Sequence, residues 1–518
     1  MVIAPTGIIR LLNVPLDMSQ SNQIRFASRA AQSAYFYGKA SKQYANVSFS
    51  RKDNMLRVPA HIDTLWNVNY VMYDNVDAGS RWFYAFIERM EYISESVTAV
   101  YIKTDVYQTW MLDCTFKNSF VIREHVSDDT IGLHTVPESV ELGNYVLEGI
   151  STANIKDLAI VVAVTEVWNG TDWVGAGGNM YNGIYSGVRL FYSTQPGAIT
   201  NFLDKYLELS GVPLTNKVDA VVAIWMVPQA LIGTSATVAE VPQSAICTPI
   251  SVNAPSLPSD LDGYTPKNNK LLTHPYCMLT ADNSAGVVAT YKYEDFESTT
   301  PAFNVFGGVM PNPSYKAIPS NMKNRVLNIS HMEYGITIAG FPMCTWSTDS
   351  FLTWLGQNSG SLGISAGGSL LAIIGGAAAG SPLAMAGGVL GAASSINQMT
   401  QQLAAPDHLN GSVNSPSANV AYRQNDIYFK AKTIKEEYAK IIDEYFTMYG
   451  YKVNRVKTPE LSSRPGWNFV QTSGANIIGG IPQEDLTELK NIFDKGVTLW
   501  HSAANVGDYS VSNDIVTP

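Results

Sequence analysis

The residues from Ser350 to Pro406 contain no Asp, Glu, Lys or Arg, and nothing else in the 518-residue chain resembles this stretch. Between Gly363 and Gln398, Leu, Ile, Val and Met are interleaved with Gly, Ala and Ser, with one proline, Pro382, near the middle. A run this long without charge belongs in a protein core, in an assembly interface or in a membrane. Any fold for this chain must give these residues one of these environments.

The centre of the uncharged run divides at Gly380-Ser381-Pro382 into two arms. As helices, arms of roughly 18 to 20 residues span roughly 27 to 30 Å, close to the ~30 Å hydrocarbon thickness of a bilayer. Glycines recur four residues apart, which lets helices pack closely in lipid and also in a soluble bundle. Each arm is only weakly apolar, so insertion needs several copies held together. A buried hairpin is the alternative, whereas a solvated linker fits poorly because the arms are too apolar.

We therefore predict a hydrophobic, membrane-active loop over residues 350–406. Its candidate residues are the glycines, the central proline and the apolar side chains between them. They are Gly363, Ile364, Gly367, Leu370, Leu371, Ile373, Ile374, Gly376, Gly380, Pro382, Leu383, Met385, Gly387, Val389, Leu390, Gly391 and Ile396.

The overall composition favours a β-rich protein with large subunit contacts. Charged residues make up 15% of the chain, against a usual ~25%, and 27 Tyr and 25 Pro take up part of the difference. The net charge of −10 argues against a protein that grips nucleic acid, but it is compatible with a wall past which DNA slides. Four widely separated cysteines without a CxxC motif predict isolated thiols. The N-terminus lacks a secretion signal, which indicates synthesis in a cytoplasm.

The chain order predicts a mainly β, α+β protein in five parts. Period-2 alternation with aromatic and β-branched residues predicts strands in an antiparallel meander, including one strand over Val97 to Asp113. We expect an N-terminal β tube domain at 1–126, an inserted middle domain at 127–272 and a continued β tube domain at 273–349. The loop at 350–406 and a C-terminal α/β part of the tube at 407–518 follow. A helix is expected at Ala198 to Ser210 from its apolar spacing.

The C-terminal part contains two predicted helices in an αβα unit. Thr433 and Glu436 have capping-box spacing ahead of an apolar stripe that ends at Gly450. The second helix begins at Pro482 with acidic residues in its first turn and ends before Gly496.

Catalytic motifs receive no support from the residues around them. GISAG, from Gly363 to Gly367, matches the G-x-S-x-G serine hydrolase pattern, but it lies in the glycine-rich run without a preceding strand. The seven histidines include no HExxH and no pair four residues apart, so we predict no metal site. We expect a protein that is not an enzyme and that needs no cofactor.

Several sequence blocks near both ends of the chain carry a family resemblance. At the C-terminal end these are YGYKVNRVKTPEL (Tyr449 to Leu461), WNFVQT (Trp467 to Thr472), IFDKGVTLWH (Ile492 to His501) and GDYSVSN (Gly507 to Asn513). Nearer the N-terminus they are WFYAFIERMEY (Trp82 to Tyr92), DVYQTWM (Asp105 to Met111), SFVIREHV (Ser119 to Val126) and, less closely, HPYCMLT (His274 to Thr280). In these blocks the chain resembles the distal tail knob, or tail tube, proteins of small short-tailed phages of Gram-positive bacteria, above all the Salasmaviridae of Bacillus.

The resemblance implies a homohexameric tube of β-barrel-like domains at the distal end of a phage tail, assembled in the host cytoplasm into the virion. It implies that one apolar loop per subunit plugs the tube and then forms a pore in the host membrane for genome ejection. Partners would be further copies of the chain, other tail proteins such as the upstream collar and the appendages, membrane lipid, and genomic DNA that passes without sequence-specific binding. Two alternatives remain open, namely a tail-tip enzyme that degrades the cell wall and a purely structural tube protein with a buried apolar interface.

Overall fold

The computed structural model describes residues 7–47, 49–50, 54–75, 81–155, 157–175, 179–181, 184–207, 220–242, 250–283, 287–307, 314–323, 336–339, 343–345 and 426–515. The chain forms two compact units. The first unit combines Met1–Gly143, Gly263–Leu272 and Glu436–Pro518, and the second combines Asn144–Asp262 and Thr273–Lys435. The chain therefore crosses between the units four times. The five-part division expected above stays a prediction.

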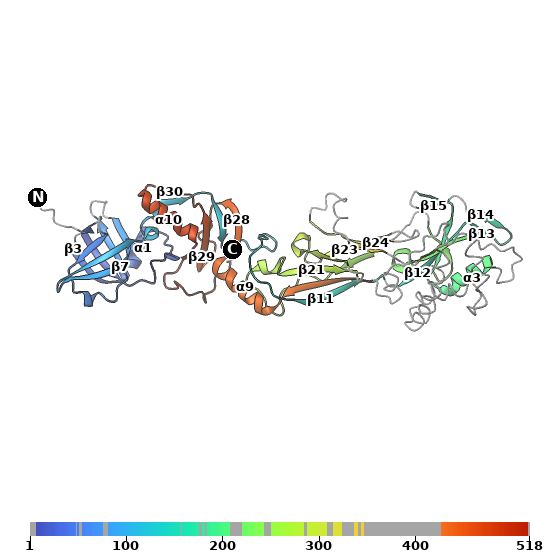
Figure 1. The fold of residues 1–518 in the computed structure, drawn as a ribbon, viewed down its shortest axis with the longest axis horizontal. Helices are drawn as coiled ribbons and strands as arrows, with labels where there is room; N and C mark the ends of the chain where they lie inside the picture. The colour runs from blue at the N-terminus through green and yellow to red at the C-terminus, as the bar shows by residue number, and fades with distance from the viewer. Residues whose placement is uncertain are drawn as a thin grey trace, which may run out of the picture. The chain divides into compact units, whose positions relative to one another are not determined.

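A curled seven-stranded sheet forms the N-terminal part of the first unit (blue in Figure 1). Its strands, in sheet order, are β3 (Ala40–Val47), β1 (Gly7–Leu12), β6 (Tyr70–Asn75), β7 (Arg81–Ser94), β8 (Val97–Thr104), β5 (Met55–Val58) and β4 (Phe49–Ser50). All neighbours in this sheet are antiparallel, and β3 and β5 approach each other, so the sheet curls toward a barrel. Leu11, Val71 and Val100 fill its interior.

The other face of the sheet is covered by α1 (Arg29–Gly38). Phe36 of this helix is fully buried, and its ring stacks on Tyr70 at 5.4 Å between ring centroids. Strand alternation explains both layers, because neighbouring residues of β6 point to opposite faces. Val71 therefore reaches the interior while Tyr70 meets the helix.

The remainder of the first unit joins the two ends of the chain. A five-stranded sheet has the order β2 (Asn22–Ile24), β31 (Val497–Trp500), β29 (Trp467–Ser473), β10 (Ser119–Glu124) and β28 (Tyr451–Lys457). The pair β2–β31 is parallel and the other pairs are antiparallel. β9 (Cys114–Phe116) pairs with β30 (Ile477–Gly479). Leu489, Ile492 and Phe493 of α10 (Gln483–Lys495) pack into the core with Val470 and Leu499 of the sheet.

Both predicted C-terminal helices are confirmed, as α9 (Glu436–Tyr449) and α10. Gly450 and Gly496 follow them with φ of +66° and +96°, as expected for helix-ending glycines. The prediction of a capping box at Thr433 is wrong. Thr433 belongs to β27 (Ile427–Ile434), and its hydroxyl donates a hydrogen bond to Glu148 Oε1 at 2.8 Å. Pairing of β27 with strands on both sides holds Thr433 in the sheet instead.

The predicted strand from Val97 to Asp113 is correct only for its first half. β8 ends at Thr104, and the Asp105 side chain accepts a hydrogen bond from the Gln108 backbone at 3.0 Å. That contact caps α2 (Val106–Trp110), because a capping carboxylate satisfies a free N–H group of the first helical turn. The two-residue alternation continues in the sequence past this point, so the pattern alone misses the change.

The second unit is built mainly from three sheets. Its five-stranded sheet has the order β19 (Ala239–Glu240), β17 (Arg189–Ser193), β12 (Leu158–Val164), β18 (Val221–Pro228) and β26 (Met343–Thr345). α3 (Pro196–Leu207) and α4 (Gln229–Ile232) pack beside it, and α3 confirms the helix expected near Ala198. Two short hairpins accompany it, β13 (Glu166–Trp168) with β14 (Trp173–Gly175) and β15 (Asn179–Tyr181) with β16 (Ile184–Ser186).

The other two sheets of the second unit each have four strands. One has the order β11 (Tyr145–Ala153), β27, β21 (Cys277–Asp282) and β22 (Val288–Tyr291), and the other β20 (Ile250–Asn253), β23 (Ala302–Gly307), β24 (Ser314–Pro319) and β25 (Ile336–Ala339). Short 3-10 helices occupy Ile62–Thr64, Met111–Asp113, Asn269–Leu272 and Tyr293–Asp295. The expected mainly β, antiparallel α+β class is confirmed. Cys114 and Cys277 carry free thiols, as predicted.

Candidate functional site

The predicted membrane-active loop, with every candidate residue from Gly363 to Ile396 and the serine of GISAG, lies outside the described residues. The structure describes the strands on either side of it. β26 ends at Thr345 before the loop, and β27 begins at Ile427 after it. Both strands belong to the second unit. These two attachments and the surfaces around them therefore define the candidate site.

The strand after the loop is held in the interior of its sheet. β27 pairs antiparallel with β11 along its whole length and with β21 from Tyr428 to Thr433. Ile427, Phe429 and Ala431 are buried, and the Phe429 and Phe303 rings lie 4.4 Å apart between centroids. A strand paired on both edges and buried on one face resists displacement. The first strand described after the loop is thus firmly held.

The strand before the loop forms the edge of the five-stranded sheet. Met343 to Thr345 pair with Trp225 to Ala223 of β18, and Trp225 is fully buried. β18 in turn pairs with β12, whose seven residues are all buried. The strands described on either side of the uncharged sequence, β26 and β27, therefore both belong to antiparallel sheets.

The four-stranded sheet that contains β27 has apolar side chains exposed at both of its edges. On β11, Leu147 and Ile150 are 56% and 54% exposed. On the opposite edge Val287 and Val288 are 49% and 59% exposed. Within the part of the chain that the structure describes, β11 and β22 have no strand on their outer sides. Open strand edges with apolar side chains favour pairing with another chain.

A buried ionic cluster in the first unit joins three parts of the chain that are far apart in the sequence. The Glu138 side chain is fully buried and contacts the Arg123 guanidinium, the Lys270 ammonium at 2.5 Å and the Lys452 backbone N–H at 2.8 Å. The Lys270 side chain is 2% exposed, and desolvation lowers its pKa despite the nearby Glu138 carboxylate. We call Arg123, Glu138 and Lys270 the buried triad.

A second buried acid ties the short segment Gly263–Leu272 to α9. The Asp443 carboxylate accepts hydrogen bonds from the Tyr264 hydroxyl at 2.8 Å and from the Lys267 and Asn268 backbones at 2.7 and 3.1 Å. Asn268 Nδ2 donates to the same carboxylate at 2.8 Å. Together with the buried triad, these contacts attach the segment by charge and hydrogen bonding. No sequence motif signalled either cluster, because their members are far apart in the chain.

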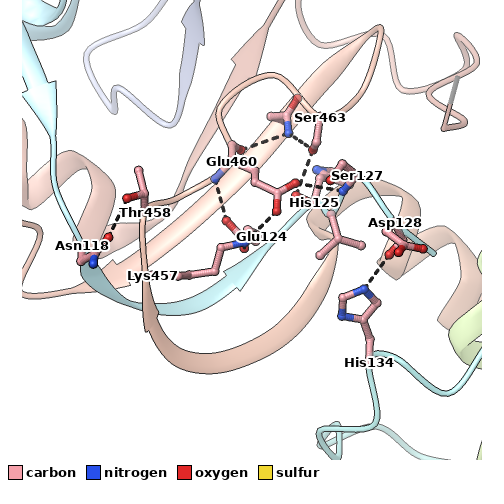
Figure 2. A network of polar contacts seen from close by, with 12 residues as sticks. Asn118, Glu124, His125, Ser127, Asp128, His134, Lys457, Thr458, Glu460 and Ser463 are labelled. Atoms are coloured by element: carbon pink, nitrogen blue, oxygen red, sulfur yellow. Dashed lines mark hydrogen bonds and ion pairs between the residues drawn. The ribbon is translucent and has the colours of Figure 1, made fainter. Parts of the chain in front are cut away.

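Figure 2 shows a third polar network, between β10 and the loop after β28. The buried Glu124 carboxylate pairs with Lys457 Nζ at 2.6 Å and accepts from the Glu460 backbone at 2.8 Å. Burial raises the pKa of Glu124, although the Lys457 ammonium opposes that shift. His125 accepts at Nδ1 from the Phe469 N–H at 2.7 Å, and its Nε2 donates to Thr447 O at 3.0 Å.

The histidine in this network has a structural role. Burial lowers the pKa of His125 to about 3, so its ring is neutral at ordinary pH, and both of its nitrogens are occupied by backbone groups. His501 is similar, with burial lowering its pKa to about 4 and its Nε2 2.9 Å from Asn468 Oδ1. With both nitrogens occupied, the His125 ring is not available to activate a nucleophile.

Two properties of the described residues bear on the expected site. No group of His, Cys, Asp and Glu side chains in the described ranges is arranged to hold a metal ion. No helix within those same ranges is both long enough and apolar enough to cross a membrane.

Comparisons with known proteins cover nearly the whole chain. Residues 248–514 match the family model described as the C-terminal domain of tail knob protein gp9 of Bacillus phage phi29. Residues 5–115 match the family model described as the N-terminus of the caudoviral major tail protein. The chain is 26% identical to tail knob protein gp9 of Bacillus phage phi29 and 27% identical to that of Bacillus phage B103, with 99% of each protein covered.

The fold is also similar to a solved structure, that of the tail knob protein gp12 of bacteriophage C1. The TM-score is 0.64 at 17% identity, over 99% of this chain and 100% of that one. The resemblance read from the sequence blocks is confirmed, because the family match contains most of these blocks and the matched relatives come from Bacillus phages. From the extent of that match, the chain belongs to the family of phage tail knob proteins represented by gp9 of Bacillus phage phi29.

Proposed function

We propose that this tail knob protein forms a ring or tube at the distal end of the tail, and that its uncharged loops close the tube and then enter the host membrane. The observation that carries the proposal is that the strands described before and after the uncharged sequence, β26 and β27, both pair within antiparallel sheets of the second unit. A segment between two paired strands can change its surroundings while the sheets keep their structure.

The open edges of the four-stranded sheet support self-assembly. The sheet contributes four antiparallel strands, so β22 of one copy can pair antiparallel with β11 of the next, and an even number of strands preserves that alternation around a ring. Pairing in this way covers Leu147 and Ile150 of one copy and Val287 and Val288 of the next. We propose six copies, as the family resemblance implies.

Ring assembly provides the number of loops that membrane entry requires. A single loop has arms diluted by glycine and serine, so its insertion is only weakly favourable. Several loops held side by side contribute additively and can surround a pore. The further partners follow from this role, namely other tail proteins above the ring, host lipid below it and DNA in its lumen. The protein is made in the host cytoplasm and acts without catalysis or a cofactor.

Dye release from liposomes tests the membrane step. The intact protein is expected to release dye, whereas a variant in which a Gly-Ser chain of equal length replaces Gly363 to Gln402 should form the same rings and release none. A subtler variant, Ile374→Asp, places a charge in one arm at a cost of about 3 kcal/mol per copy in lipid and should reduce release. Rings with an intact loop sequence that leave vesicles sealed, or loop-replaced rings that still release dye, would refute the membrane role.

The serine of GISAG provides a matched control. Ser365→Ala changes one hydroxyl in the same loop and should leave dye release unchanged. If Ser365→Ala abolished release, or if the purified protein cut cell-wall glycan or peptide, an enzymatic mechanism would replace the one proposed here.

A further inference from the structure

Arg10 of β1 is a buried cation that lacks a counter-charge. It alternates with Ile9 and Leu11, which fill the interior of the curled sheet, so it lies on the side that α1 covers. The residue is 8% exposed, and its Nε donates to Gln43 Oε1 at 3.1 Å. Nη1 is buried without a hydrogen-bond partner. An arginine has five side-chain N–H donors, so most of these donors have no acceptor in the part of the chain that the structure describes.

Two aromatic rings hold this guanidinium. Its central carbon lies 4.4 Å from the centroid of the Tyr37 ring and 4.5 Å from the centroid of the Trp82 ring. Tyr37 belongs to α1 and Trp82 to β7, so a helix and a strand fix the two rings. Contact with the rings offsets part of the desolvation penalty of the cation, but it supplies no hydrogen-bond acceptor in the plane of the guanidinium. The arginine is therefore held in place with its Nη donors free.

The other buried cations of the described residues have acceptors from within the chain. Arg123 and Lys270 both contact the Glu138 carboxylate. Arg464 donates to the backbone oxygens of Val126 and Asn513. Arg10 has the neutral amide of Gln43 alone, and it forms no ion pair within the described ranges. A buried charge without a partner is unfavourable in a finished structure, which indicates that an anion reaches Arg10 from outside the single copy.

We propose that Arg10 is a docking site for a carboxylate side chain of the neighbouring copy in the tail knob ring. The inference rests on the ring proposed above, and it assigns one contact between copies to a particular residue of the first unit. The planar guanidinium matches the two oxygens of a carboxylate, and a charge-assisted hydrogen bond is stronger than a neutral one. The ring neighbour thus supplies the counter-charge that the single copy lacks.

A second copy of the chain is a suitable source of this carboxylate. In a head-to-tail ring, one face of each copy meets a different face of the next, so every Arg10 meets the same acid. The chain has 44 Asp and Glu against 34 Lys and Arg, which leaves surplus carboxylates on its surface. Glu88 and Glu95 of the first unit, for example, are exposed and have no ion pair among the described residues.

Arg10→Met separates a docking role from a structural one. Methionine keeps an unbranched stem between the rings and removes the charge, and the exposed Gln43 amide then bonds to water. Full-length protein diluted below the concentration at which rings form should keep or raise its urea midpoint, because a buried charge without a partner is gone. The concentration at half assembly should rise about 10- to 100-fold, because each copy loses a charge-assisted hydrogen bond. A lower urea midpoint with unchanged assembly would show that Arg10 serves only the fold.

Arg57→Met is the matched control, because Arg57 is an exposed arginine on β5 of the same sheet. It removes the same charge from the same unit and should leave the concentration at half assembly unchanged. Arg10→Lys keeps the charge without the planar fork, so its assembly should lie between those of the parent and Arg10→Met. Equal weakening by Arg10→Met and Arg57→Met would overturn the specific role of Arg10.

Cross-linking with a carbodiimide identifies the acid that docks. The reagent activates a carboxylate, which the amine of Arg10→Lys attacks to form an amide, while the reagent leaves as a urea. Rings assembled from equal amounts of 15N-labelled and unlabelled Arg10→Lys should give cross-linked peptides that combine one labelled and one unlabelled partner. Cross-links with matching isotopes only, such as a link to Asp74 on the same face of the sheet, would place the partner within one copy and overturn the proposal.

The outcomes distinguish this inference from the proposed function. Particle images of the parent first show whether rings form, and an absence of rings would overturn both. Parent rings that form normally, together with Arg10→Met rings of equal affinity and no mixed-isotope cross-link, would overturn the Arg10 contact alone. Dye release from liposomes tests the membrane step separately, and its failure would leave the Arg10 contact standing.

Discussion

Replacing Glu138 by Gln removes the only acid of the buried triad and leaves the Arg123 and Lys270 cations beside each other without their counter-charge. The exposed fractions of the three side chains are 10% for Arg123, 0% for Glu138 and 2% for Lys270, so water screens their charges poorly. Removing one partner of such a buried pair costs about 3 to 5 kcal/mol. We expect a decrease of this size in the free energy of unfolding of the first unit.

Hydrogen exchange followed by mass spectrometry can measure this decrease for each unit separately. Peptides from 436–518 report on the first unit, and peptides from 157–175 report on the second. At about 1.4 kcal/mol for each factor of ten, the expected decrease corresponds to exchange roughly 100 to 4,000 times faster in the first unit. Peptides of the second unit should change much less.

Two further variants isolate the buried charge as the cause. Glu436→Gln breaks the exposed pair with Lys440 on α9 and should cost about 0.3 to 0.5 kcal/mol. The triple change Arg123→Met, Glu138→Leu and Lys270→Met removes every charge of the triad and should recover most of the stability that Glu138→Gln removes. If Glu138→Gln left exchange in the first unit unchanged, or cost no more than Glu436→Gln, the argument from buried charge would be refuted.

Two other changes probe the first unit. Burial raises the pKa of Asp105 from 3.8 to about 6, so the folded state holds this proton more tightly and Asp105 makes stability fall as pH rises from about 4 to about 6. Asp105→Asn should flatten that part of the pH profile of urea unfolding, and an unchanged slope would contradict the assignment. Gly450→Ala puts a Cβ 2.1 Å from Glu124 O at a φ of +66°, whereas Gly474→Ala, at +68°, meets nothing within 4 Å. Gly474→Ala should cost about 1 kcal/mol and Gly450→Ala clearly more, and equal urea midpoints would show that the close approach to Glu124 is unimportant.

Local sequence patterns were sufficient to predict an element whose structure is determined by its own residues. The α10 helix could be predicted from the acidic residues after Pro482 and from Gly496, because these residues act on the ends of the helix that contains them. Family membership was readable in the same way from short blocks of sequence. Thr433 shows the limit, since its spacing to Glu436 predicts a helix cap while two partner strands hold it in a sheet.

The polar sites of the first unit were not readable from sequence for a related reason. Glu138 meets Arg123, Lys270 and Lys452 only after three distant segments fold together. The structural role of His125 likewise comes from burial and from two backbone contacts with residues more than 300 positions away.

The sequence by itself determined that Ser350 to Pro406 contains no Asp, Glu, Lys or Arg, and from this we predict a buried or membrane environment for the run. It also determined the mainly β class, since strand alternation and turn residues act locally. Only the tertiary structure decided that β27 lies inside its sheet and β26 at the edge of another, and which face of the β27 sheet is covered. Those decisions depend on contacts between residues far apart in the chain, which no local pattern records.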